Sequence, residues 1–91
     1  MKKWILMASL CLVAVAAQAQ SYKEYVRKAL DAMSMDSTEV AERLFREAMR
    51  VEPAQRSNAM IYYQIGRMQE HRGKLEKALE SYTMGLNVAP H

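Results

Sequence analysis

Apolar side chains recur at spacings of three and four along most of the chain, which is the period of an amphipathic helix. From residue 21 onward, no stretch shows the period of two that a half-buried strand has. The pattern therefore predicts an all-α chain with four helices. They are expected over Ser21 to about Met33, from about Asp36 to just before Pro53, over Asn58–Arg72 and over Lys74–Val88.

Residues that begin and end helices stand between these segments. Asp36, followed three residues later by Glu39, resembles a capping box and predicts that Asp36 begins the second helix. Pro53 ends that helix, because the residue before a proline is kept out of the helical conformation. Gly73 supplies the next turn, and Pro90 closes the last helix. The chain is thus expected to form two helix pairs, each closed by a proline.

Each predicted helix carries an apolar stripe, and the stripe of the second helix is the most regular. These stripes give every helix a face that can pack against a neighbour. Their members are Tyr22, Tyr25, Val26, Ala29, Leu30 and Met33; Val40, Ala41, Leu44, Phe45, Ala48 and Met49; Ile61, Tyr62, Ile65, Gly66 and Met68; and Leu75, Ala78, Leu79, Tyr82, Gly85 and Leu86.

The two helix pairs share a residue pattern at an offset of 37 positions. Small residues let two helix backbones approach closely, and an aromatic ring fills the space beside them. We therefore expect each pair to be an antiparallel hairpin that stacks on the other. The matched positions are Tyr25 with Tyr62, Ala29 with Gly66, Ala41 with Ala78, Phe45 with Tyr82, Ala48 with Gly85 and Pro53 with Pro90.

This pattern resembles the tetratricopeptide repeat (TPR), whose consensus combines Trp-x2-Leu-Gly-x2-Tyr with Ala-x3-Phe and a final proline. The resemblance implies an α-solenoid of two stacked repeats, at about residues 22–55 and 59–91. The chain departs from the family at Gln69, where an aromatic residue is usual, and at Lys28, where a leucine is usual. Its period is 37 residues, whereas about 34 is typical of the family. The second pair matches the consensus with Tyr62, Ile65, Gly66, Ala78, Tyr82, Gly85 and Pro90.

Residues 1–19 have the composition of a secretory signal peptide. Lys2 and Lys3 form a positive start, an apolar run of 13 residues follows, and Ala17-Gln18-Ala19 fits the cleavage pattern. The run is shorter than the roughly 20 apolar residues of a membrane span. Cleavage after Ala19 is expected to leave residues 20–91 as an exported bacterial protein of the periplasm or cell envelope, with no integral membrane span.

The mature chain has little net charge, no cysteine and no catalytic motif. From Ser21 onward there are 11 Lys and Arg residues against 10 Asp and Glu, which disfavours nucleic acid as a partner. Cys11 lies in the leader, so thiol chemistry and cysteine-bound zinc are excluded. His71 and Glu70 lie among charged neighbours, as on a solvated helix face. We expect no metal, no cofactor and no enzymatic activity.

The resemblance also implies where a ligand binds, because TPR proteins use the first helix of each pair to line a concave face. An extended partner segment with apolar side chains would suit this face. The leading hypothesis is therefore a non-catalytic protein–protein interaction module of the cell envelope. The residues expected to line the face are Lys23, Val26, Leu30, Met60, Tyr63 and Arg67, an apolar strip with a cation toward either end.

Two other functions stay open from the sequence. Ser21–Met33 carries tyrosines on its apolar side and Lys23, Arg27 and Lys28 elsewhere, which loosely suits a helix lying on a membrane surface. Alternatively, the chain is the repeat portion of a larger envelope enzyme.

The small number of repeats bears on stability and association. About three repeats are usually needed to bury enough apolar surface, and this chain offers two. We expect it to be a truncated piece of a longer protein; otherwise a partner or a second copy covers its last helix. The exposed end of that helix, at Leu79, Leu86 and Val88, is expected to make the isolated mature chain weakly folded or self-associating.

Overall fold

The computed structural model describes residues 20–88, and it contains the four helices predicted for this part of the chain. The first covers residues 20–34 and is followed by α2 (Thr38–Val51), α3 (Asn58–His71) and α4 (Leu75–Val88). Within residues 20–88 there is no strand. The prediction of an all-α chain is confirmed for these residues. The predicted leader, residues 1–19, and Pro90 lie outside them.

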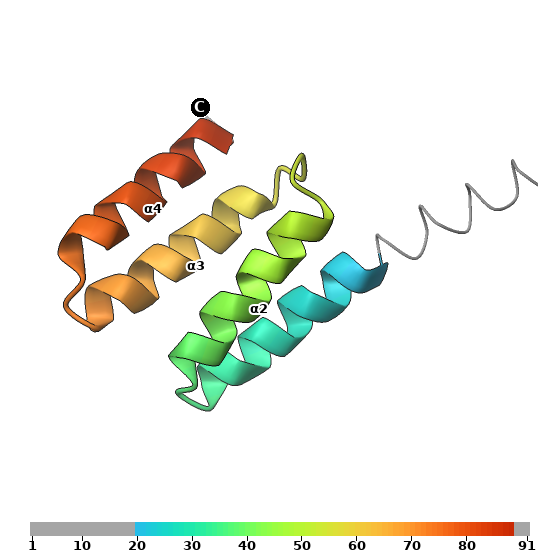
Figure 1. Ribbon diagram of the computed structural model, residues 1–91, viewed down its shortest axis with the longest axis horizontal. Helices are drawn as coiled ribbons and strands as arrows, with labels where there is room; N and C mark the ends of the chain where they lie inside the picture. The colour runs from blue at the N-terminus through green and yellow to red at the C-terminus, as the bar shows by residue number, and fades with distance from the viewer. Residues whose placement is uncertain (1–19, 89–91) are drawn as a thin grey trace, which may run out of the picture.

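Consecutive helices run in opposite directions and form two hairpins (Figure 1). The first hairpin consists of helix 20–34 and α2, and the second consists of α3 and α4. α3 packs against α4 and also contacts α2, so α3 joins the two hairpins. Among α2, α3 and α4, the last helix contacts only α3.

The turns inside the two hairpins have the same backbone structure, 37 residues apart. Asp36 has a φ of 59° and Gly73 a φ of 78°, so both are in the left-handed region. The next residue donates its N–H to the carbonyl five residues earlier, over 2.9 Å from Ser37 and 2.8 Å from Lys74. Such bonds satisfy carbonyl groups left unpaired at a helix C-terminus. The repeat of residue types is therefore accompanied by a repeat of turn geometry.

The predicted capping box at Asp36 is wrong. Asp36 lies inside the turn, and α2 begins after Ser37, whose side chain makes no capping hydrogen bond. Aspartate tolerates the left-handed conformation because its short polar side chain can bond locally, so Asp36 takes the place that Gly73 has in the second hairpin. The predictions that α2 ends before Pro53 and that Gly73 turns the chain are confirmed.

A core shared by both hairpins lies at their junction. Phe45 of α2 and Ile65 of α3 are buried there, with 1% and 0% of their surfaces exposed. The Tyr22 hydroxyl donates to Asn58 Oδ1 over 2.8 Å and lies 2.7 Å from Ser57 Oγ. Because these polar groups bond one another, their burial costs little free energy. The core consists of Tyr22, Ala29, Ala41, Phe45, Ala48, Met49, Ile61, Ile65 and Met68.

The glycines of the repeat signature lie where α3 and α4 pack tightly against one another. A β-carbon at Gly66 would lie 2.6 Å from the Tyr82 ring, and one at Gly85 would lie 3.2 Å from the Ala59 carbonyl oxygen. Gly66 thus makes room for an aromatic ring, while Gly85 lets the α4 backbone approach the α3 backbone. The other small residues of the signature are also buried: Ala29, Ala41, Ala48 and Ala78.

The two residues that differ from the TPR consensus have different surroundings. Lys28 is exposed, and its ammonium group lies 3.9 Å from the Glu24 carboxylate. Gln69 is buried, and its side-chain carbonyl accepts a hydrogen bond of 2.6 Å from the buried Ser81 hydroxyl. A polar pair therefore fills the space between α3 and α4 at this level of the second hairpin.

Part of the predicted apolar stripes lies on the surface. Val40 on α2 is exposed, and so are Leu75, Leu79 and Leu86 on α4. The buried side of α4 is formed by Ala78, Ser81 and Gly85, which turns its leucines away from α3. The exposure expected for Leu79 and Leu86 is confirmed, whereas Val88 is half-buried.

Candidate partner-binding surface

A groove of about 370 Å³ lies between helix 20–34 and α3, and we call it the apolar groove. Val26, Leu30 and Met60 line it, together with the buried side chains of Phe45 and Ile61. Leu30 is 48% exposed and Met60 is 63% exposed, so both are accessible to a ligand. The complete lining is Tyr22, Lys23, Val26, Arg27, Leu30, Phe45, Ser57, Met60, Ile61 and Gln64.

The structure brings together four of the six residues expected on the concave face, namely Lys23, Val26, Leu30 and Met60. Tyr63 lies toward α4 instead, where its ring centroid is 5.8 Å from that of Tyr82 and the rings are tilted by 42°. The Arg67 guanidinium lies 5.9 Å from the Tyr63 ring centroid, a distance that permits a cation–π contact. The six residues therefore do not all line one groove: Tyr63 shares a second groove with Met60, and Arg67 lines a third pocket.

Tyr63 lines a different groove of about 740 Å³ at the far side of α3, which we call the end groove. Val26 in the apolar groove and Tyr63 in the end groove are equivalent positions, 37 residues apart. Equivalent residues therefore need not line the same groove, although Lys23 and Met60, which are also 37 positions apart, both line the apolar groove. The end groove is lined by Arg56, Ser57, Ala59, Met60, Tyr63, Tyr82, Gly85 and Leu86.

Sequence reasoning missed Arg27 and Gln64, which complete the apolar groove from its two sides. They too are equivalent positions, and both line the same groove. The 37-residue offset could have found them only if combined with the handedness of the stack. That handedness depends on how the hairpins pack and is not encoded in the spacing alone.

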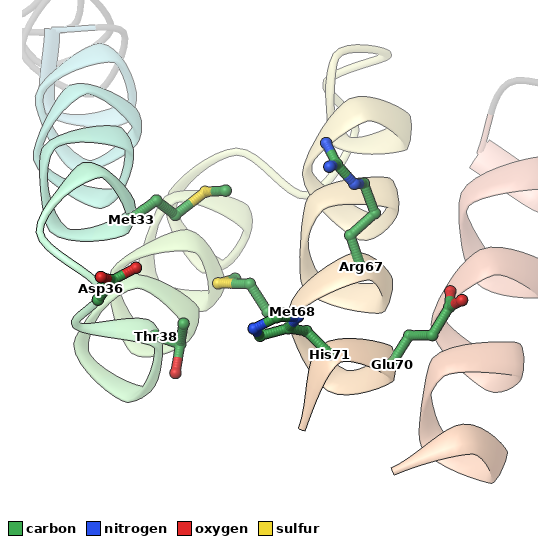
Figure 2. Close-up of a pocket in the computed structure, with 7 residues that line it drawn as sticks. All are labelled: Met33, Asp36, Thr38, Arg67, Met68, Glu70 and His71. Carbon is green, nitrogen blue, oxygen red and sulfur yellow. The ribbon is translucent and has the colours of Figure 1, made fainter. Parts of the chain in front are cut away.

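A polar pocket of about 670 Å³ lies further along the same side of α3 (Figure 2). Met33 and Met68 extend toward one another across the gap between the first hairpin and α3, as Figure 2 shows. Glu70 points toward α4, where its carboxylate accepts a hydrogen bond of 2.8 Å from the Tyr82 hydroxyl. The valley beside α3 is thus apolar at one end and polar at the other. The pocket is lined by Met33, Asp36, Thr38, Arg67, Met68, Glu70 and His71.

Charged side chains surround the apolar groove. The Arg27 guanidinium donates to both carboxylate oxygens of Glu24, over 2.9 and 3.1 Å, and lies 3.9 Å from Asp31. The hydrogen bond and charge of Arg27 hold the pKa of Glu24 below its usual range. Arg27 and Glu24 therefore both stay charged near neutral pH.

Burial raises the pKa of the Tyr82 hydroxyl beside the end groove, and the hydrogen bond to Glu70 adds to that effect.

Within residues 20–88, no three His, Cys, Asp or Glu side chains gather closely enough to hold a metal ion. None of the helices described in that range is both long enough and apolar enough to cross a membrane. Comparison of the chain with protein-family models, with curated proteins and with solved structures found no match.

Proposed function

We propose that residues 20–91 form an exported, non-catalytic interaction module of TPR type, which binds an extended segment of a partner protein in the apolar groove. The proposal places the mature protein in the periplasm or cell envelope, because residues 1–19 have the composition of a cleavable leader. It requires no cofactor and no metal.

The two hairpins support a TPR-type arrangement through features that recur at the same offset. The turns at Asp36 and Gly73 share their left-handed conformation, and small residues are buried at equivalent positions on both second helices. The two turns therefore share their backbone conformation, and the signature positions of the two second helices share small residues. An α-solenoid is built from such repeated hairpins.

The apolar groove is the observation that carries the proposed function. Val26, Leu30 and Met60 present apolar side chains to solvent in one depression between two helices. Exposed apolar side chains gathered in a groove are typical of sites that bind another protein. Lys23 and Arg27 line the same groove and add positive charge. A segment with aliphatic or aromatic side chains and a nearby acidic residue would therefore fit it best.

The alternative of a membrane-surface helix is less well supported. Tyr22 and Ala29 lie on the apolar side of helix 20–34 and are buried in the core shared with α2 and α3. The helix could present this face to lipid only by leaving that core, which would expose the other core residues to water. A flotation assay with anionic lipid vesicles tests the alternative, since the proposed module stays with the soluble fraction.

Selection of random peptides displayed on phage against the mature chain tests the proposed function. Selected peptides should be rich in apolar residues and should bind the wild type at least about ten times more tightly than Leu30→Glu or Met60→Glu, a difference of about 1.4 kcal/mol. Lys77→Glu, at an exposed position of α4 that does not line the apolar groove, is the matched control and should bind as the wild type does. Circular dichroism checks that each variant keeps its helical content. Peptides that bind both groove variants and the wild type equally would contradict the proposal.

A further inference from the structure

The two ends of the hairpin stack have opposite chemistry. In the second hairpin, Ile61, Ile65 and Met68 are the buried α3 residues that pack into the core shared with the first hairpin. The equivalent residues on helix 20–34, 37 positions earlier, are Glu24, Lys28 and Asp31, and all three are exposed. The flank that α3 uses to cover a neighbour is therefore charged on helix 20–34.

At the other end of the stack, α4 presents an apolar row to solvent. Leu75, Leu79 and Leu86 are 66%, 68% and 67% exposed. Spacings of four and seven place these leucines on one face of the helix, beside the ring of Tyr82. Met49 on α2 is equivalent to Leu86, yet it is only 9% exposed because α3 covers α2. The same face of the second helix of each hairpin is therefore buried on α2, where α3 covers it, and exposed on α4.

The α4 row is also more apolar than the row that α3 covers. The α2 residues equivalent to Leu75 and Leu79 are Thr38 and Glu42, and the carboxylate of Glu42 lies 3.9 Å from the Arg72 guanidinium. On α2 the covered row is thus polar in its first half and apolar in its second. A helix that covers α4 must be apolar along its whole length.

We propose that α4 packs antiparallel against α4 of a second copy of this chain and forms a symmetric dimer. A head-to-tail stack is disfavoured, because it would press the leucines against Glu24, Lys28 and Asp31 and remove those charges from water. Among the described residues, the other exposed large apolar side chains, apart from Met84 on a different face of α4, lie on helix 20–34, in the turn at Met35, on α2 and on α3. The α4 row of a second copy is therefore the surface that can cover the α4 row of the first.

The charges beside the row fix the direction of the pairing. Glu76 and Glu80 flank the first half of the row, while the uncharged Thr83 and Asn87 flank its second half. An antiparallel pair sets each glutamate beside the uncharged half of the other helix, whereas a parallel pair would set glutamates side by side. A symmetric interface of this kind uses the same residues on both copies and closes at two subunits.

Analytical ultracentrifugation of the mature chain, residues 20–91, tests the dimer. A row of three leucines is small beside the roughly 800 Å² per partner of a standard interface, so we expect dissociation in the micromolar range. The average mass should double as the concentration rises, and Leu79→Glu should weaken the dimer at least about tenfold. Leu30→Glu, which places the same charge in the apolar groove, is the control and should dimerise as the wild type does. This inference does not rest on the proposed function.

Chemical crosslinking distinguishes the arrangement of the subunits, because residues 20–91 contain no cysteine. Single Thr83→Cys chains should be joined to one another by a short bis-maleimide, whereas single Lys28→Cys chains should not. A mixture of the two variants that yields mainly Thr83→Cys to Lys28→Cys products would reveal head-to-tail stacking and overturn the proposal. A chain that stays monomeric at the highest concentration would also overturn it, whether its α4 row then binds a synthetic helix with the α3 sequence, a lipid vesicle or neither.

Discussion

The aromatic residues that fill the two hairpins occupy equivalent positions but have different surroundings. Phe45 lies at the junction of the hairpins and is buried. Tyr82 is half-buried, packs on Gly66 and donates a hydrogen bond from its hydroxyl to the Glu70 carboxylate. α3 covers the face of α2 that carries Phe45, but none of the described helices covers the corresponding face of α4. The residue signature therefore determines packing inside a hairpin, while burial between hairpins depends on a neighbour.

Truncation of the two aromatic residues should give the largest difference between the hairpins. Phe45→Ala is expected to destabilise the fold by about 3–5 kcal/mol, because it opens a cavity in the shared core. A chain of this size is only marginally stable, so this variant should lose its cooperative unfolding transition. Tyr82→Ala should cost less and keep the transition. Urea unfolding followed by circular dichroism measures both, and equal losses would contradict the comparison.

The glycine that accommodates the Tyr82 ring should be the next most sensitive position. Gly66→Leu is expected to cost about 1–3 kcal/mol, because even a β-carbon at this position would lie 2.6 Å from the ring. Glu80→Leu, which places the same side chain on an exposed position of α4, should cost almost nothing. Thermal unfolding of the two variants provides the measurement. If both lost the same helicity, the helix faces assigned to α3 and α4 would be wrong.

Removal of one tyrosine hydroxyl from each hairpin should show that a buried hydrogen bond contributes more stability than an exposed one. Tyr22→Phe removes the hydroxyl that donates to Oδ1 of the buried Asn58 and should cost about 1 kcal/mol. Tyr82→Phe removes a bond to the exposed Glu70, whose carboxylate can bond to water instead, so its cost should be smaller. Chemical denaturation resolves the difference. A larger loss for Tyr82→Phe would show that the second hairpin is the more tightly packed one.

The smallest effect is expected from the charged flank of helix 20–34. Because the pKa of Glu24 is lowered in the folded chain, its pairing with Arg27 contributes stability above the unfolded pKa. That contribution is lost as the pH falls through the folded pKa. Glu24→Gln should therefore lower stability slightly near neutral pH and leave it unchanged in strong acid. Denaturation at a series of pH values measures this, with Ile61→Gln at the equivalent buried position as the contrast. A loss of stability as large for Glu24→Gln as for Ile61→Gln would contradict the assignment of this flank of helix 20–34 as charged and solvated.

The helices and the hairpin interiors could be predicted from the sequence because they depend on local features. The helical period, Pro53 and Gly73 set the helix limits, and small residues at matched positions indicated where backbones approach. The capping box at Asp36 failed, because the same aspartate can cap a helix or occupy a left-handed turn. Its alignment with Gly73 was the signal for the turn.

The candidate site could be predicted only in part because a groove between hairpins depends on the handedness of their packing. Lys23, Val26, Leu30 and Met60 were expected together and are found together. Tyr63 was expected beside them but lies on the opposite flank of α3. Repeat spacing identifies equivalent residues, but it does not say which flanks of neighbouring helices meet.

Methionine methyl groups provide the most direct test of the apolar groove as the partner-binding site. Residues 20–91 carry methionines in the valley beside α3, in the core and on α4, where Met84 lies in a depression shared with α2 and α3 residues, so isotope-labelled methyl groups report on each region separately. Titration of a chain of residues 20–91 with a phage-selected peptide should shift the NMR signal of Met60 most, and that of Met33 if the peptide extends into the polar pocket. The signals of Met49 and Met84 should stay in place. A large shift at Met84 with none at Met60 would contradict the account, because the partner would then bind on α4 and not in the groove.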